Sequence, residues 1–246
     1  MHRSRFSLLK ETLSPTLCLP LPHAARPSGY ACLLLALGIL FFTPLAHASV
    51  SVETTSLGHS VKAWYVANES VPVVDVILSF EGAGSASDAE GKAGRAAFAA
   101  ALLTEGPGDP DSSAFRRALA EHATQIHVTT EPARLTIHVY CLREHAVRAG
   151  ELLALALSRP PLADSDQARM KADLASFIAR LQEQPHYRAE RALTTRIFQG
   201  HPYANAPYGT PESLAALNTQ DVRDYLNTYI TRGNVLVTAA GAVDAS

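Results

Sequence analysis

Residues 125–142 read Gln-Ile-His-Val-Thr-Thr-Glu-Pro-Ala-Arg-Leu-Thr-Ile-His-Val-Tyr-Cys-Leu, and this stretch decides the fold class. Apolar and polar residues alternate on both sides of Pro132-Ala133, which predicts two strands, 125–131 and 134–142, joined by a two-residue turn. Pairing Glu131 with Arg134 places the apolar residues of both strands on one face. The facing pairs are then Ile126 with Val139, Val128 with Ile137, and Thr130 with Leu135.

The sequence on either side of this hairpin alternates between strand and helix patterns. Upstream we expect a strand or hairpin in 50–66, a buried β-branched strand in 72–80, an alanine-rich buried helix in 93–103, and a helix that begins at Asp111 or Ser112. Downstream we expect helices in 144–158, 164–183, 186–198 and 218–230, and a last strand in 235–240. No internal repeat or linker interrupts these patterns, so the chain beyond its leader is expected to form one mixed α/β unit.

Composition excludes two broad classes of protein. Apolar residues make up 47% of the 246 residues, enough for a core, so the chain is not disordered. The 21 Lys and Arg residues are balanced by 23 Asp and Glu residues, so the chain has no basic surplus for neutralising phosphates. We therefore expect no nucleic-acid partner.

Residues 1–48 resemble a secretory signal peptide. Basic residues precede an apolar run over 30–42, and Ala46-His47-Ala48 forms a small-x-small cleavage site. The run is too short for a permanent membrane span, which needs about 20 residues. We expect cleavage after Ala48, export to the periplasm, and a mature domain over 49–246. Cys141 is then the one remaining thiol, and its place on the apolar side of a strand predicts a core residue.

The helix at 94–106 carries the most informative pattern, Gly-Arg-Ala-Ala-Phe-Ala-Ala-Ala-Leu-Leu-Thr-Glu-Gly. It resembles, without a gap, the zinc-binding helix G-[LxA]-H-x-x-E-H-x-L-x-x-G of the insulinase/pitrilysin family of metallopeptidases. Later segments match that family in order and spacing: Pro160-Pro161-Leu162, His201-Pro202-Tyr203, Gly209 to Leu214, Asn234 to Val237, and Gly241 to Asp244. The resemblance covers 50–246. It implies an α+β half-domain with a mixed, largely antiparallel sheet and helices packed against it.

The chemistry of the family is missing from this sequence. In active members, two histidines bind zinc and the glutamate between them activates a water molecule. Ala97, Ala100 and Ala101 occupy these positions here, and alanine offers neither a metal ligand nor a proton acceptor. The third ligand is a glutamate that the resemblance places within 174–179, where the sequence is Leu-Ala-Ser-Phe-Ile-Ala. We therefore expect no catalytic residue and no bound zinc.

Other candidate residues favour structural roles. The hairpin register puts His127 opposite His138, where two imidazoles could share a metal with a third ligand, but we favour a polar sheet face. We expect Ser85 to lie in an ordinary turn, His145 and His186 at the surface, His201 in a structural loop, and Glu105 to act as a cap or solvated charge. No phosphate loop, dinucleotide motif or serine-nucleophile motif is present.

The resemblance implies three functions, in descending order of support. The first is a non-catalytic subunit that encloses or binds peptide beside a separate zinc-bearing subunit. The second is a stand-alone periplasmic binding or scaffold module, or a truncated split-gene product that pairs with itself or with a separately encoded second half. The third, an active zinc metalloendopeptidase, conflicts with every ligand position.

Overall fold

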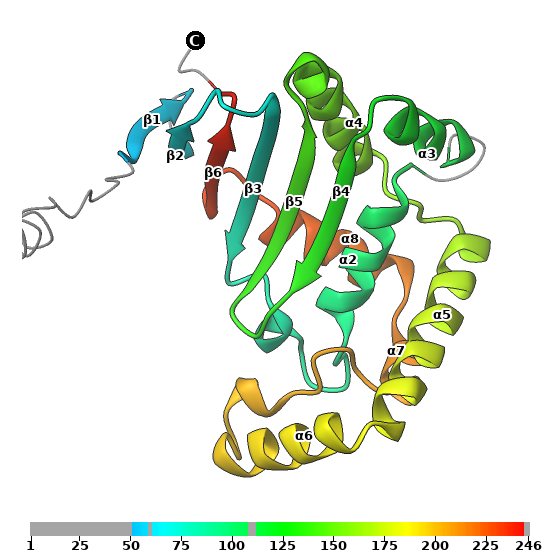
Figure 1. The fold of residues 1–246 in the computed structure, drawn as a ribbon. Coiled ribbons are helices and arrows are strands. Elements are labelled where there is room, and N and C mark those ends of the chain that lie inside the picture. The colour runs from blue at the N-terminus through cyan, green and yellow to red at the C-terminus, as the bar shows by residue number, and fades with distance from the viewer. Residues whose placement is uncertain (1–50, 59–60, 108–111, 244–246) are drawn as a thin grey trace, which may run out of the picture. The chain divides into compact units, whose positions relative to one another are not determined.

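A six-stranded sheet forms the centre of the fold (Figure 1). The computed structural model describes residues 51–58, 61–107 and 112–243, so the predicted leader, 1–48, lies outside the described residues. The strand order is β1-β2-β6-β3-β5-β4. The strands are β1 (Glu53–Leu57), β2 (Val61–Ala67), β3 (Val73–Glu81), β4 (Gln125–Thr130), β5 (Arg134–Leu142) and β6 (Val235–Gly241).

Strand pairing confirms the predicted mixed, largely antiparallel sheet. The β4–β5 hairpin has the predicted register, with Ile126 opposite Val139 and Val128 opposite Ile137. The last strand, β6, inserts between β2 and β3, parallel to β2 and antiparallel to β3. The sheet therefore joins β2 to the last described strand through a pairing that local sequence patterns do not reveal.

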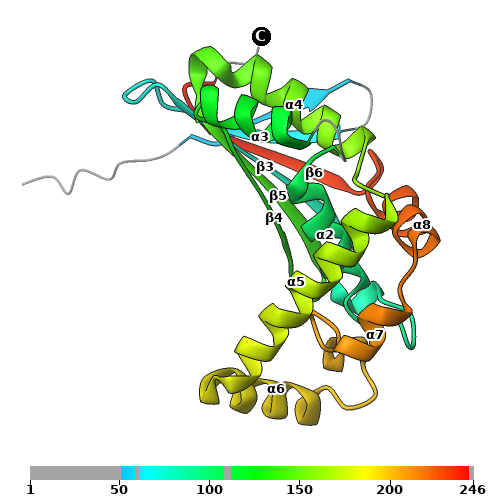
Figure 2. The same cartoon turned by 90° about the vertical axis from the view of Figure 1, so that its right-hand side faces the viewer.

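The helices gather on one side of the sheet and leave the other face uncovered by the described residues (Figure 2). They are α2 (Arg95–Glu105), α3 (Ser112–Glu121), α4 (Ala146–Ser158), α5 (Asp164–Glu183), α6 (Pro185–Ile197), α7 (Pro211–Ala216) and α8 (Thr219–Tyr229). Short 3-10 turns at 85–87, 143–145 and 202–204 connect them. Among the described residues, no helix has the length and apolarity that a membrane crossing requires.

The core lies between α2 and the helix-facing side of the sheet. α2 is almost entirely buried, as its alanine-rich sequence predicts, and its Phe98 and Leu102 have no exposed surface. The alternation of β5 buries Leu135, Ile137, Val139 and Cys141 on this side. Cys141 is 2% exposed, which confirms its predicted core position, and burial raises the pKa of its thiol.

Two local features differ from the sequence-based expectations. The segment after Gly209 forms a separate helix, α7, which begins with a capping box between Thr210 and Ser213. His145, expected at the surface, is only partly exposed, with 28% of its side-chain surface accessible, and its ring packs edge-on against His122 with ring centroids 4.9 Å apart.

Candidate functional site

The N-terminal end of α2 is anchored by a buried carboxylate. Asp88 accepts hydrogen bonds from the backbone N–H groups of Gly94, at 2.8 Å, and Ala96, at 3.0 Å. Arg95 lies beside it, with Nε 3.7 Å from Asp88 Oδ1. Burial raises the pKa of Asp88 to about 6, although both N–H groups and the guanidinium favour the charged form. These contacts orient the helix that carries the family's zinc-binding positions.

Those positions line a cavity. Ala97, Ala100 and Ala101 face a space of about 220 Å³ between α2, the end of β4 and α5. Leu174 of α5 closes it from the far side, and the remaining lining residues are Val128, Thr129, Thr130 and Tyr208. Leu174 belongs to the window in which the resemblance places the third zinc ligand, so the structure brings the two halves of the family site together as the sequence predicts.

A loop that precedes α7 holds Tyr208 at this cavity. Gly94 and Gly209 have φ angles of 87° and 77°, and a Cβ on either would lie within 2.5 Å of a carbonyl oxygen on the opposite segment. Ser213 Oγ donates to the Ala93 carbonyl at 2.7 Å. The Tyr208 ring packs edge-on against Phe177 at 5.1 Å. No local sequence pattern points to Tyr208, because its place at the cavity depends on this contact between distant segments.

The outer edge of β4 borders the cavity and has no partner strand among the described residues. Glu131 N–H donates to the Arg134 carbonyl at 2.9 Å, so these two residues form a hydrogen-bonded pair. Hydrogen-bonded and non-hydrogen-bonded pairs alternate along an antiparallel hairpin, so Thr130 and Val128 belong to non-hydrogen-bonded pairs. The N–H and C=O groups of Val128 and Thr130 consequently point away from β5. They form a short row of backbone donors and acceptors next to the three alanines.

The residues around the cavity do not fit a zinc ion. Among the described residues, the lining contains no histidine, cysteine, aspartate or glutamate, and its side-chain donors are the hydroxyls of Thr129, Thr130 and Tyr208. A neutral hydroxyl is a poor ligand for zinc, and no side chain there can act as a general base. These side chains therefore do not supply the chemistry for peptide hydrolysis.

The alternative metal site at the paired histidines gains no support from its surroundings. His127 and His138 are opposite each other on the uncovered sheet face, as predicted. His138 Nε2 lies 2.5 Å from Asp75 Oδ1, whereas His127 Nε2 lies 3.4 Å from Gln125 Oε1. No group of three potential metal ligands occurs in the described parts of the chain.

The remaining predicted residues have structural surroundings. Glu105 closes α2 and forms ion pairs at 3.2 Å with Arg116 and Arg169, so it joins three helices rather than acting as a cap. His201 begins the 3-10 turn at 202–204, where its Nδ1 accepts from the Tyr203 N–H at 3.2 Å. Ser85 lies in a turn, with its N–H bonded to the Glu131 carbonyl, and His186 is exposed.

Sequence comparison assigns the family. The sequence profile of the insulinase family, peptidase family M16, matches residues 63–211. The chain belongs to the insulinase family. The match includes α2 with its three alanines and the whole of α5, so the M16 alignment spans both places at which zinc ligands are missing.

Individual relatives agree with an inactive member of family M16. The chain is 25% identical over 205 residues to the non-peptidase homolog YmxG of Helicobacter pylori, covering 81% of this chain and 47% of YmxG. Its fold matches a peptidase M16 inactive domain from Pseudomonas fluorescens with a TM-score of 0.71 at 23% identity, over 79% of this chain and 47% of that one. It also matches pitrilysin with a TM-score of 0.70 at 16% identity, over 81% of this chain and 22% of pitrilysin. The chain thus spans about half the length of the relatives YmxG and the inactive domain, and the α+β half-domain fold is confirmed.

Proposed function

We propose that this chain is a non-cleaving M16 subunit that binds an extended peptide along the free edge of β4. The observation that carries the proposal is the position of this edge beside the former catalytic helix. The backbone groups of Val128 and Thr130 point outward next to Ala97, Ala100 and Ala101. A peptide strand added there would form main-chain hydrogen bonds, the mode of recognition called β-augmentation.

The cavity gives this edge a preference for one kind of side chain. In an added strand, alternate side chains point to the helix-bearing face of the sheet, where the cavity of about 220 Å³ lies. Its walls are mostly alanine, leucine and valine carbons, with a tyrosine at one side. We infer that it accepts an aliphatic side chain of the peptide, in the space that ligands and metal occupy in an active relative.

The absence of ligand residues leads to two further parts of the proposal. The chain binds no zinc and cleaves no peptide by itself, so hydrolysis of its bound peptide requires a separate zinc-bearing M16 subunit. The leader pattern of residues 1–48 supports export, so we propose that both subunits work in the periplasm.

Peptide binding can be measured by fluorescence anisotropy with a labelled peptide of alternating leucine and serine. We expect the peptide to bind and remain intact by mass spectrometry. Val128→Pro removes one outward N–H without removing a bond to β5, so affinity should fall at least about fivefold, the value of one hydrogen bond of about 1 kcal/mol. Ala101→Phe fills the cavity. It should therefore weaken the binding of peptides that carry leucine at the facing position more than the binding of peptides that carry alanine there.

Two controls make the test decisive. Ala189→Phe, on an exposed position of α6, adds the same bulk away from the site and should leave binding unchanged. Unfolding midpoints of all variants show whether each remains folded. Binding that is equal in wild type, Val128→Pro and Ala101→Phe would refute the site.

The partner and the metal are tested separately. Elemental analysis after exposure to zinc and dialysis should find less than about a tenth of an equivalent per chain, because the family's ligands are absent. One retained equivalent would overturn the zinc-free proposal and direct attention to His127 and His138. On size exclusion, mixing with a zinc-bearing M16 subunit should give an earlier-eluting complex, whereas a concentration-dependent homodimer alone would favour a stand-alone module.

A further inference from the structure

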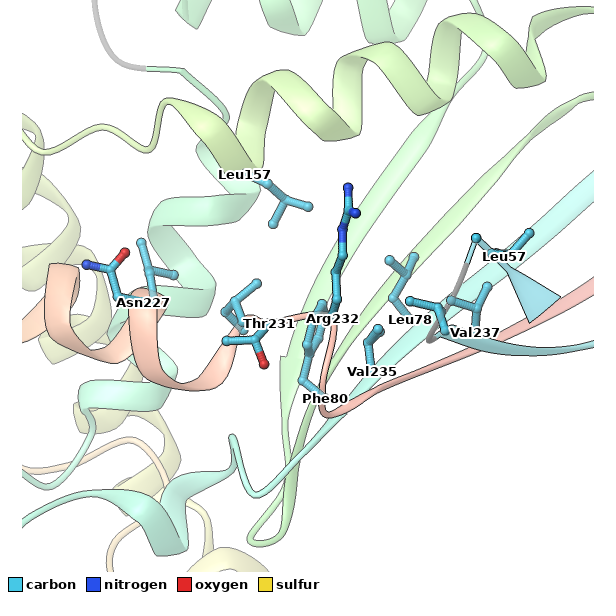
Figure 3. Close-up of a pocket in the computed structure, with 13 residues that line it drawn as sticks. Leu57, Leu78, Phe80, Leu157, Asn227, Thr231, Arg232, Val235 and Val237 are labelled. Atoms are coloured by element: carbon cyan, nitrogen blue, oxygen red, sulfur yellow. The ribbon is translucent and has the colours of Figure 1, made fainter.

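A second cavity, of about 810 Å³, lies on the helix-bearing side of the sheet and shares no lining residue with the cavity at the three alanines (Figure 3). Its floor consists of Leu78 and Phe80 of β3 and Val235 and Val237 of β6. Leu157, at the end of α4, forms one wall. This volume falls within the range of about 300–1,000 Å³ that is typical of small-molecule sites.

The apolar floor is exposed because the helices cover the other end of the sheet. α2 packs against β4 and α4 packs against β5, while β2 and β6 pair mainly with neighbouring strands. Leu78 and Val237 therefore remain only half-buried, although the alternation of their strands directs them to the same side as the core. Water in contact with this surface would be released by an aliphatic ligand, which favours binding.

Among the described residues that line this cavity, one carries a positive charge. Arg232, in the turn between α8 and β6, lines the cavity and is exposed. In Figure 3 its side chain extends away from the floor, between Leu157 and Leu78 in this view. No ion pair or hydrogen bond links its guanidinium to another described residue, and none of the described residues that line the cavity is acidic. The guanidinium is available to a ligand carrying one anionic group.

We propose that this cavity binds a long-chain aliphatic carboxylate. The hydrocarbon chain lies over Leu78, Val235 and Val237, and the carboxylate accepts hydrogen bonds from Arg232. A planar guanidinium matches the two oxygens of a carboxylate, and such charge-assisted bonds are about twice as strong as neutral ones. The floor of the site lies on β3 and β6, which β5 separates from β4. The proposal does not depend on the function proposed for the edge of β4.

Isothermal titration with dodecanoate and with dodecanol, both below their solubility limits, tests the proposal. We expect saturable binding of both, tighter for the carboxylate. Arg232→Gln should lower the affinity for dodecanoate about tenfold, the equivalent of a charge-assisted hydrogen bond, and leave the affinity for dodecanol unchanged. Arg223→Gln, at an exposed arginine of α8, is the matched control and should change neither.

Val237→Trp fills the floor and should abolish binding of both ligands. Leu157→Trp at the wall is a second variant with the same expected result, should Val237→Trp fail to give a cooperative unfolding transition. Absence of saturable binding in wild type, or equal dodecanoate affinity in Arg232→Gln and Arg223→Gln, would overturn the proposal. Retained affinity in a folded tryptophan variant would overturn it as well.

Discussion

The buried carboxylate of Asp88 should make the stability of the fold fall as the pH rises from about 4 to 6. Its side chain has no exposed surface, and burial raises its pKa to about 6 from an ordinary 3.8. The folded chain therefore binds a proton more tightly than the unfolded chain. The stabilisation that results from this tighter proton binding is fully present below pH 3.8 and is lost as the pH rises to about 6.

The size of the effect follows from the difference between the two pKa values. Each pKa unit corresponds to about 1.4 kcal/mol, so a shift from 3.8 to about 6 contributes at most about 3 kcal/mol. Asp88→Asn removes the titrating group and keeps one of the two acceptor oxygens, so it also loses the hydrogen bond from Gly94 or from Ala96, a cost that does not vary with pH. The variant should lose the part of the pH dependence that belongs to this residue.

The assay is urea unfolding of wild type and Asp88→Asn at several values from pH 4 to pH 7, followed by circular dichroism. The free energy of unfolding of wild type, relative to the variant, should decrease by up to about 3 kcal/mol over this range. Other carboxylates contribute equally to both proteins and cancel in the difference. Parallel profiles for the two proteins would refute the assignment of this pKa to Asp88.

Three further substitutions test packing, backbone conformation and charge. Phe98→Ala, at a fully buried position, should reduce the free energy of unfolding by about 3–5 kcal/mol in a urea titration. Gly94→Ala should lower the free energy of unfolding by more than about 1 kcal/mol, because Gly94 has a positive φ and a carbonyl oxygen close to the position of the new Cβ. Gly150→Ala, in open space on α4, should leave the free energy of unfolding unchanged or raise it. Equal effects of the two substitutions would contradict the backbone argument. Asp221 is partly buried, which opposes ionisation, but its hydrogen bond with Lys92 lowers its pKa. Lys92→Met should therefore cost up to about 1 kcal/mol at pH 7, and less as the pH falls below 3.8, as thermal unfolding at both pH values can show.

Local patterns were enough to predict most elements of the fold. The β4–β5 register was predictable because a one-residue shift would move Val128 and Ile137 from the core to solvent. The position of β6 was not predictable from such patterns, because its partners in β2 lie more than 150 residues earlier in the chain. The partial burial of His145 depends on His122, which lies in the turn after α3, so no local pattern around His145 indicates it.

The candidate site was predictable only in part. The three alanines and the 174–179 window followed from matching one helix to a family pattern, and Leu174 does line the same cavity. Tyr208 and the outward backbone groups of β4 were not predicted. The first depends on a contact between two glycine-containing segments, and the second depends on β4 being the last strand of the sheet.

The central position of β6 has a consequence for biosynthesis. The β1–β2 hairpin joins the rest of the sheet only through β6, whose residues, 235–241, are synthesised after those of the other described strands. Until then, β3 lacks one neighbouring strand and the hairpin has no sheet to join. The sheet is therefore completed only once β6 has been synthesised, and a chain that stops before Val235 would expose both β2 and β3 to self-association.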